Sequence, residues 1–151
     1  MTLVIGSTAP DFEIKTADNE TFKLSDHRGK KVIIYFYPKD STPGCTIESC
    51  AFRDAHPDFT KANAVILGIS KDSLKSHAKF KEKHQFPFDL GSDEDGAVCT
   101  AYGTFVEKSM FGKKYMGIER STFLIDENGK ITGLWRKVKV KGHVQDVLNS
   151  L

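Results

Sequence analysis

The stretch Lys31-Val-Ile-Ile-Tyr-Phe-Tyr37 decides the fold, because β-branched and aromatic residues follow one another there without a charge after Lys31. Such a run is typical of a strand that is covered on both faces, and Pro38 marks its end. Residues 64–70 form a second run of this kind, and a polar helix over about residues 73–85 follows it. A buried strand followed by a helix predicts a parallel crossover within one sheet.

Shorter elements complete this pattern. Residues 12–23 alternate on either side of a polar turn, which predicts a small hairpin at the periphery. Residues 121–135 contain two apolar runs around Asn128-Gly129, a pair that supplies the positive φ of a tight antiparallel hairpin. Apolar residues recur at helical spacing over residues 142–151. We therefore expect an α/β fold with a mixed central sheet, helices on both faces and an N-terminal hairpin.

Composition limits the class of protein. The 151 residues include 22 Lys and Arg against 20 Asp and Glu, and 39% are apolar, which fits one domain over residues 1–151 and excludes a disordered chain. A net charge of +2 provides no long-range field for a nucleic acid partner. The longest apolar run, residues 32–37, is far short of the roughly 20 residues that cross a bilayer. No membrane partner is expected.

Cysteine usage and the beginning of the chain predict a compartment. Three cysteines are too few, and odd in number, for the disulfide framework of a small secreted protein. The first thirty residues contain no apolar stretch like that of a signal peptide. We expect a cytoplasmic protein.

Cys45 is the first candidate for chemistry. It follows the buried strand and Thr42-Pro-Gly, at the predicted start of a helix that continues to about residue 55. The free N–H groups at a helix N-terminus carry partial positive charge, so they favour a thiolate. Nucleophilicity falls as a thiol becomes more acidic, so further groups must stabilise the transition state. The alternative is that Cys45 is a small, buried, unreactive residue.

Cys50 lies five residues further along the same predicted helix. The helical rise alone separates the two Cα atoms by roughly 7.5 Å, beyond the usual range of a disulfide. The spacing predicts a helix with two states, whose first turns open when Cys45 is oxidised and Cys50 attacks it. Cys50 could instead be a buried, inert thiol. No metal site is expected, because there is no second cysteine pair and no paired histidine spacing.

The spacing Pro38-x3-Thr42-x2-Cys45 resembles the active-site signature of the peroxiredoxins, and the second cysteine five residues later resembles their bacterioferritin-comigratory, or Q-type, branch. The later Gly-Ile-Glu-Arg-Ser-Thr-Phe-Leu-Ile-Asp126 strengthens the resemblance. It implies a thioredoxin-like fold and a monomeric thiol peroxidase without metal or organic cofactor. The implied substrates are hydrogen peroxide and organic hydroperoxides, and the implied reductant is thioredoxin or a similar dithiol.

The resemblance also implies a role for each site residue. Cys45 would attack the terminal oxygen of the peroxide and become a sulfenic acid, and Cys50 would condense with it to a disulfide. Thr42 would hold the peroxide, and Arg120 would stabilise both the thiolate and the departing oxygen. Taken alone, Arg120 could equally form a surface ion pair with a nearby carboxylate.

Three residues of the loop before the helix are further candidates. Pro38 and Pro43 would shape the loop, and Gly44 would let the backbone approach the substrate. All three could instead be ordinary punctuation between a strand and a helix. Two other functions would use the same cysteines: a redox-sensing binding module whose disulfide rearranges a partner surface, and a disulfide reductase like thioredoxin. The C-x4-C spacing weakens the second of these.

Other features are weaker signals. Cys99 has apolar neighbours and is expected to be an inert core thiol, the alternative being a resolving partner elsewhere in the sheet. The basic residues 136–141 alternate with apolar ones, as an exposed strand would. Residues 105–116 show no clear period, and we expect a loop near the active site. Phe111 or Met116 would line the peroxide pocket or the surface that is exposed when the helix unwinds.

Overall fold

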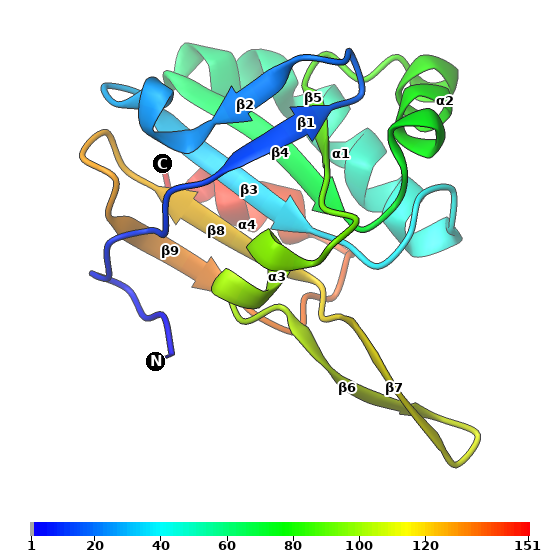
Figure 1. Ribbon diagram of the computed structural model, residues 1–151. Helices are drawn as coiled ribbons and strands as arrows, with labels where there is room; N and C mark the ends of the chain where they lie inside the picture. The colour runs from blue at the N-terminus through cyan, green and yellow to red at the C-terminus, as the bar shows by residue number, and fades with distance from the viewer. Residues whose placement is uncertain (1) are drawn as a thin grey trace.

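The computed structural model describes residues 2–151 (Figure 1). Its main sheet has seven strands in the order β2-β1-β5-β4-β3-β8-β9, and β6 and β7 form a separate two-stranded sheet. The elements in chain order are β1 (Glu13–Thr16), β2 (Thr21–Lys23), the 3-10 helix η1 (Leu24–His27), β3 (Lys31–Phe36), α1 (Pro43–Lys61), β4 (Ala64–Ser70), α2 (Leu74–His84), β5 (Asp89–Ser92), α3 (Ala97–Ala101), β6 (Phe105–Met110), β7 (Lys113–Ile118), β8 (Ser121–Ile125), β9 (Ile131–Trp135) and α4 (His143–Asn149).

The central position of β3 follows from its apolar sequence. Residues 32–36 are all buried, so both faces of this strand are covered. It pairs in parallel with β4 and antiparallel with β8, and β4 pairs in parallel with β5. The predicted parallel crossover and mixed sheet are confirmed.

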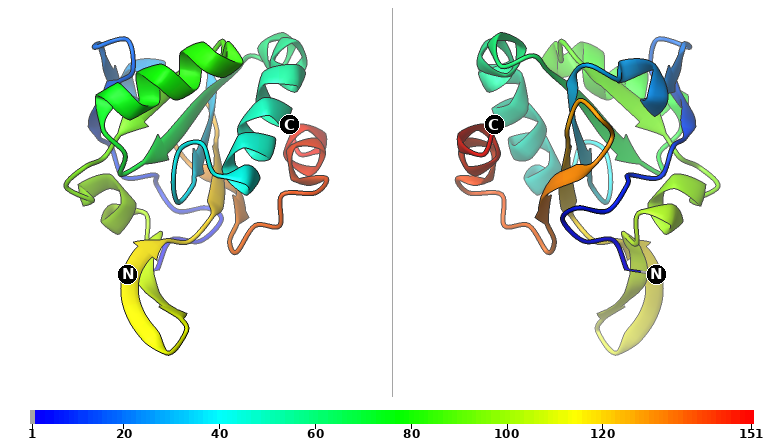
Figure 2. Two further views of the ribbon diagram at one scale, coloured as in Figure 1. Left: turned by 90° about the vertical axis from the view of Figure 1, so that its right-hand side faces the viewer. Right: turned by 90° about the vertical axis from the view of Figure 1, so that its left-hand side faces the viewer.

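Alternate side chains of β3 enter two separate cores. Ile33 and Tyr35 pack with residues of α1, α2 and α4 on one face. Ile34 and Phe36 pack with residues of α3 and the N-terminal segment on the other. The two edge-on views in Figure 2 show α1 and α4 on one side of the sheet and α3 on the opposite side. Helices therefore cover both faces, as predicted, although α3 is short.

Both hairpins predicted for the main sheet are present. β1 pairs antiparallel with β2, and β8 with β9. In the second turn Gly129 has a positive φ of 84°, whereas Asn128 does not. The Asn128-Gly129 prediction is wrong in this respect, because the connection is longer than a two-residue turn. The carboxylate of Asp126 organises it by accepting hydrogen bonds from the N–H groups of Asn128 and Lys130.

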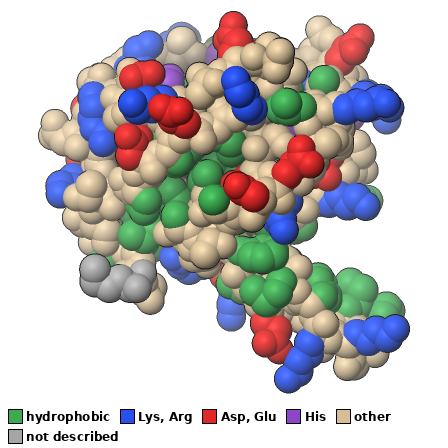
Figure 3. Space-filling view, viewed as in Figure 1, with side chains coloured by type: hydrophobic (Ala, Val, Ile, Leu, Met, Phe, Trp, Pro, Cys, Tyr) green, Lys and Arg blue, Asp and Glu red, His purple; other side chains and the backbone are tan. Residues whose placement is uncertain are grey.

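The expectation of a loop over residues 105–116 is wrong, because β6 and β7 form an antiparallel hairpin there. Phe111 and Gly112, both with positive φ, make the turn. The hairpin projects from the body of the protein (Figure 1), and hydrophobic and basic side chains lie exposed along it (Figure 3). Most of its residues are exposed on both faces, so no alternation of polar and apolar residues marks the strands. Phe111 is 98% exposed at the tip and lines no pocket.

The sequence predicted an exposed strand at the basic residues 136–141. That prediction is wrong, because these residues form no strand. They follow β9, which is an edge strand, and offer a single backbone hydrogen bond to the sheet region, from Val138 N–H to the carbonyl of Arg120 at 3.0 Å.

Within residues 2–151, no helix combines the length and apolar character that a bilayer crossing requires.

Candidate active site

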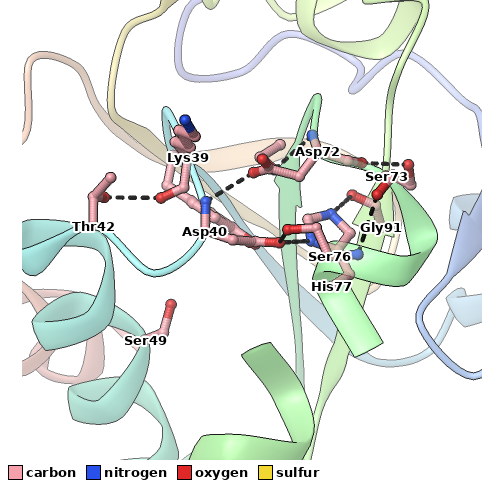
Figure 4. Close-up of polar contacts among 12 residues, drawn as sticks. Lys39, Asp40, Thr42, Ser49, Asp72, Ser73, Ser76, His77 and Gly91 are labelled. Carbon is pink, nitrogen blue, oxygen red and sulfur yellow. Dashed lines mark hydrogen bonds and ion pairs between the residues drawn. The ribbon is translucent and has the colours of Figure 1, made fainter. Parts of the chain in front are cut away.

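The segment between β3 and α1 brings the predicted loop residues together. Pro43 is the first residue of α1, where its missing N–H costs nothing because that group has no partner inside a helix. Thr42 is the N-cap in an extended conformation, but its side chain does not cap the helix. Its hydroxyl instead donates to the carbonyl of Lys39 at 2.8 Å, as Figure 4 shows. The lone pairs of this oxygen remain available to a ligand.

Cys45 is the third residue of α1, in the first turn as the sequence predicted. The residue is 1% exposed. The Nη2 atom of Arg120, the residue just before β8, donates to Cys45 Sγ at 3.2 Å. A thiolate at this place therefore faces a guanidinium and the free N–H groups of a helix N-terminus, both of which stabilise negative charge.

Arg120 does not form the surface ion pair that was its alternative explanation. Its Nη1 donates to Oε1 of Glu48 at 2.7 Å, not to Glu119 or Asp126. The guanidinium side chain is 15% exposed. Burial works against its charge, but Glu48 and Cys45 outweigh burial and raise the pKa of Arg120. It is a permanent cation shared between a carboxyl group and a thiol.

Glu48 is a site residue that sequence reasoning missed. It lies three residues after Cys45, so the same face of α1 presents both to Arg120. Its side chain is fully buried and its Oε2 has no hydrogen-bond partner. Burial raises the pKa of Glu48 to about 7, although Arg120 acts in the opposite direction. Its position three residues after Cys45 was the only sequence signal for a site residue. A glutamate in a polar helix is usually solvated, so the signal is weak.

Gly44 lies next to the Arg120 guanidinium, on the side where another residue would carry its Cβ. A Cβ built on this residue would lie 3.3 Å from Arg120 Nη2, closer than most real contacts of that kind. The glycine therefore leaves room for the guanidinium beside Cys45.

Cys50 is half-buried and faces a different part of the molecule. Five residues turn a helix by about 500°, so Cys45 and Cys50 point about 140° apart around α1. Cys50 Sγ lies 3.8 Å from Nδ1 of His84 at the end of α2, and both cysteines are free thiols. Both residues lie in one unbroken helix, the wound state that the sequence predicted for the reduced protein.

A buried network around Asp40 holds the loop in place (Figure 4). One carboxylate oxygen accepts from Tyr37 Oη at 2.6 Å, and the other lies 2.6 Å from Nδ1 of His77. The Asp40 N–H donates to Asp72 Oδ2 at 2.8 Å. The loop that carries Thr42 is thus tied to α2 and to the segment between β4 and α2 through hydrogen bonds, none of which the sequence revealed.

Within residues 2–151, the one cluster of side chains that could hold a metal ion belongs to this network. Asp40, Asp72 and His77 each offer a ligand atom, all within 4.8 Å of one another. These atoms are already engaged, since Asp72 Oδ2 accepts from the Ser70 hydroxyl at 2.6 Å and from the Asp40 N–H. The arrangement fits hydrogen bonding within the protein, and we assign no metal to it.

Two remaining expectations concern Cys99 and Met116. Cys99 is fully buried in α3, and burial and Asp93 raise the pKa of its thiol far above the usual range. Its expected place in the core is confirmed, and its inertness stays a prediction. Met116 is 53% exposed and lines a hollow between the β6–β7 hairpin and the loop, together with Pro38 and Lys108.

Comparisons with known proteins agree with this geometry. The AhpC/TSA family profile matches residues 5–133. Peroxiredoxin Bcp of Bacillus subtilis is 54% identical over 151 residues, which cover all of this chain and 96% of that protein. Peroxiredoxin Bcp of Escherichia coli is 44% identical over 149 residues, covering 99% of this chain and 96% of that one.

Solved structures show the same architecture. A mutant of Xanthomonas campestris Peroxiredoxin Q superposes with a TM-score of 0.91 at 47% identity, covering 98% of this chain and 94% of that one. A mutant of Xylella fastidiosa PrxQ gives a TM-score of 0.93 at 40% identity, with coverage of 99% and 95%. With its thioredoxin-like sheet, the chain therefore belongs to the AhpC/TSA family, in the bacterioferritin-comigratory, or Q-type, peroxiredoxin branch.

Proposed function

We propose that this chain reduces hydrogen peroxide and organic hydroperoxides through Cys45, that Cys50 resolves the oxidised sulfur as an intramolecular disulfide, and that thioredoxin or a similar dithiol restores both thiols. Membership of the family makes the chain a thiol-dependent peroxidase. The observation that supports the assignment of Cys45 is the 3.2 Å hydrogen bond from Arg120 Nη2 to its sulfur.

In the first step the Cys45 thiolate attacks the terminal oxygen of the peroxide. The S–O bond forms as the O–O bond breaks, the sulfur becomes a sulfenic acid, and the leaving oxygen takes a proton to depart as water or an alcohol. Negative charge moves from sulfur to the leaving oxygen. Arg120 is fixed by Glu48 at 2.7 Å, so its guanidinium is already oriented when that charge develops.

Thr42 acts in this step as an acceptor. Its hydroxyl hydrogen is used on the carbonyl of Lys39, so its lone pairs are free for the O–H of the hydroperoxide. Such a bond orients the terminal oxygen toward the sulfur. Pro38 and Pro43 fix the loop on either side of Thr42, and Gly44 makes room for the guanidinium.

In the second step the first turns of α1 open so that the Cys45 sulfur can reach Cys50. The Cys50 thiol attacks the sulfenic sulfur, the S–S bond forms and water leaves. A dithiol then reduces this bond and is itself oxidised to a disulfide. We place the protein, as a monomer, in the cytoplasm, because such a dithiol keeps thiols reduced there.

Peroxide consumption by cysteine variants, with a recycling thioredoxin system, tests the proposal. Cys45→Ser should abolish turnover, and Cys50→Ser should allow one oxidation and then stall. Cys99→Ser is the matched control and should turn over normally, because that thiol is buried away from the site. Normal turnover by Cys45→Ser would overturn the proposal. A single slow oxidation of the unmodified protein in excess peroxide would instead indicate a redox sensor.

A further inference from the structure

The surroundings of Cys50 contain a proton acceptor to which the first step assigns no task. Nδ1 of His84 lies 3.8 Å from Cys50 Sγ, within reach of an S–H···N hydrogen bond. The imidazole stacks on Phe86, with ring centroids 5.5 Å apart, and meets Phe80 edge-on at 5.3 Å. Aromatic packing on two sides thus holds the ring with this nitrogen toward the sulfur.

The charged groups around this pair favour a neutral imidazole beside an ionisable thiol. Burial, together with Lys83 of α2 and Arg53 of α1, lowers the pKa of His84, so the ring is uncharged at neutral pH and can accept a proton. Arg53 also interacts electrostatically with Cys50, and its Nε pairs with Asp54 at 3.0 Å.

Arg53 also connects the two helices next to this pair. Arg53 lies three residues after Cys50 in the chain, and its Nη1 donates to the carbonyl of His84 at 2.9 Å. This bond ties α1 to the end of α2 beyond the turns that must open. Cys50 and His84 can therefore stay together while the Cys45 end of the helix unwinds.

Cys45 has different partners. Its sulfur accepts a hydrogen bond from Arg120, which is paired with Glu48, and within residues 2–151 no histidine is hydrogen-bonded to it. A group next to Cys50 can therefore change the second step without changing the first.

We propose that His84 is the general base of the resolving step, an inference that rests on the assignment of Cys50 under the proposed function. Nδ1 takes the proton of the Cys50 thiol as its sulfur attacks the Cys45 sulfenic sulfur. The S–S bond forms, the S–O bond breaks, and the leaving hydroxide recovers a proton from Nδ1 to become water. Cys50 is oxidised and the sulfenic sulfur is reduced, so no other reagent is needed.

The size of the effect follows from the ionisation of thiols. Only a few per cent of an ordinary thiol is ionised at neutral pH, so a base in contact with it accelerates attack. We expect about 10-fold to 100-fold, because general bases contribute from about 100-fold upward and a thiol that ionises by itself needs less help.

A single-turnover experiment on His84→Gln tests the inference, with His56→Gln on α1 as the matched control. Each protein receives one equivalent of hydrogen peroxide, dimedone traps sulfenic acid at successive times, and mass spectrometry measures the trapped acid and the disulfide. Sulfenic acid should form at the unmodified rate in both variants. Disulfide formation should slow about 10-fold to 100-fold in His84→Gln alone at pH 7.

The pH profile distinguishes a base from a structural support. The deficit of His84→Gln should vanish near pH 9, because ordinary thiols ionise there without a base. Disulfide formation in the unmodified protein should slow in acid as His84 becomes protonated. Free imidazole should restore the rate of His84→Ala. A support for folding would lower the thermal unfolding temperature and would be neither pH-dependent in this way nor rescued.

Failure of this inference can be told from failure of the proposed function. If the unmodified protein forms no Cys45–Cys50 bond, the resolving role of Cys50 is wrong. If it forms the bond and His84→Gln does so within twofold of the same rate from pH 6.5 to 9, only the role of His84 is wrong. In the Cys45→Ser background, alkylation of Cys50 by iodoacetamide at pH 7 should also be slower with His84→Gln, and equal rates would contradict the inference.

Discussion

The buried carboxyl group of Glu48 should make the stability of the protein depend on pH. Burial raises its pKa from 4.5 to about 7, even though Arg120 favours the charged form. Between these values the folded protein holds a proton that the unfolded chain has lost. The free energy of unfolding therefore falls as the pH rises: the contribution of Glu48 is fully present below about pH 4.5 and is lost above about pH 7. At 1.36 kcal/mol for each pH unit, the loss is roughly 3 kcal/mol.

Glu48→Gln should remove this dependence, because the amide has nearly the same shape and never ionises. Near pH 4.5 the variant and the unmodified protein should be about equally stable. At pH 8 the variant should be more stable by roughly 3 kcal/mol. Urea unfolding of the reduced proteins, followed by circular dichroism at pH 5, 6.5 and 8, measures the difference at each pH.

Glu82→Gln on the exposed face of α2 is the control, and it should show no comparable change with pH. A difference between Glu48→Gln and the unmodified protein that stays constant from pH 5 to 8 would refute the reasoning. In that case the buried carboxyl group would not bind its proton through the neutral range, and the assumed cost of its burial would be wrong.

Three further results are expected. Arg120→Ala should lower the second-order rate with peroxide by on the order of 100-fold to 1,000-fold in stopped-flow experiments, since one preorganised charge donor to Cys45 is lost, and an unchanged rate would remove Arg120 from the mechanism. His77→Gln removes a fully buried hydrogen-bond partner of Asp40 and should cost about 3–5 kcal/mol, seen as a fall of roughly 10 °C in the thermal unfolding temperature. Phe111→Ser should change stability by less than about 0.5 kcal/mol by urea unfolding, because this ring is exposed at the hairpin tip, and a larger loss would mean that the ring packs against something.

Six of the seven strands of the main sheet could be predicted because they carry their own signals, whereas β5 could not, since Asp89-Leu-Gly-Ser92 has neither a β-branched nor an aromatic residue. β3 and β4 are buried on both faces, so β-branched and aromatic residues fill them without interruption. The β6–β7 hairpin could not, since most of its residues face water and nothing selects an alternating pattern. Asn128-Gly129 misled because a longer turn is stabilised by the Asp126 carboxylate.

The site was predictable only where neighbouring residues define it. Cys45 stands out because a loop, a proline and a helix start converge on it within one short stretch. Arg120 is 75 residues away from it, and His77 is 37 residues from Asp40, so these pairs exist only through the packing of distant elements. The resemblance to a family supplied Arg120, but neither spacing nor resemblance identified Glu48, Asp40 or His84.

The near-complete burial of Cys45, a residue that is only 1% exposed, separates reagents by size. A molecule as small as hydrogen peroxide has little to displace in reaching the sulfur, whereas a bulky maleimide must wait for the surrounding turn to unfold locally. The labelling rate with the large reagent therefore reports the local unfolding of this turn and not the intrinsic reactivity of the thiol. Comparing the labelling rates of large and small electrophiles on one sample would therefore measure how often the first turns of α1 open.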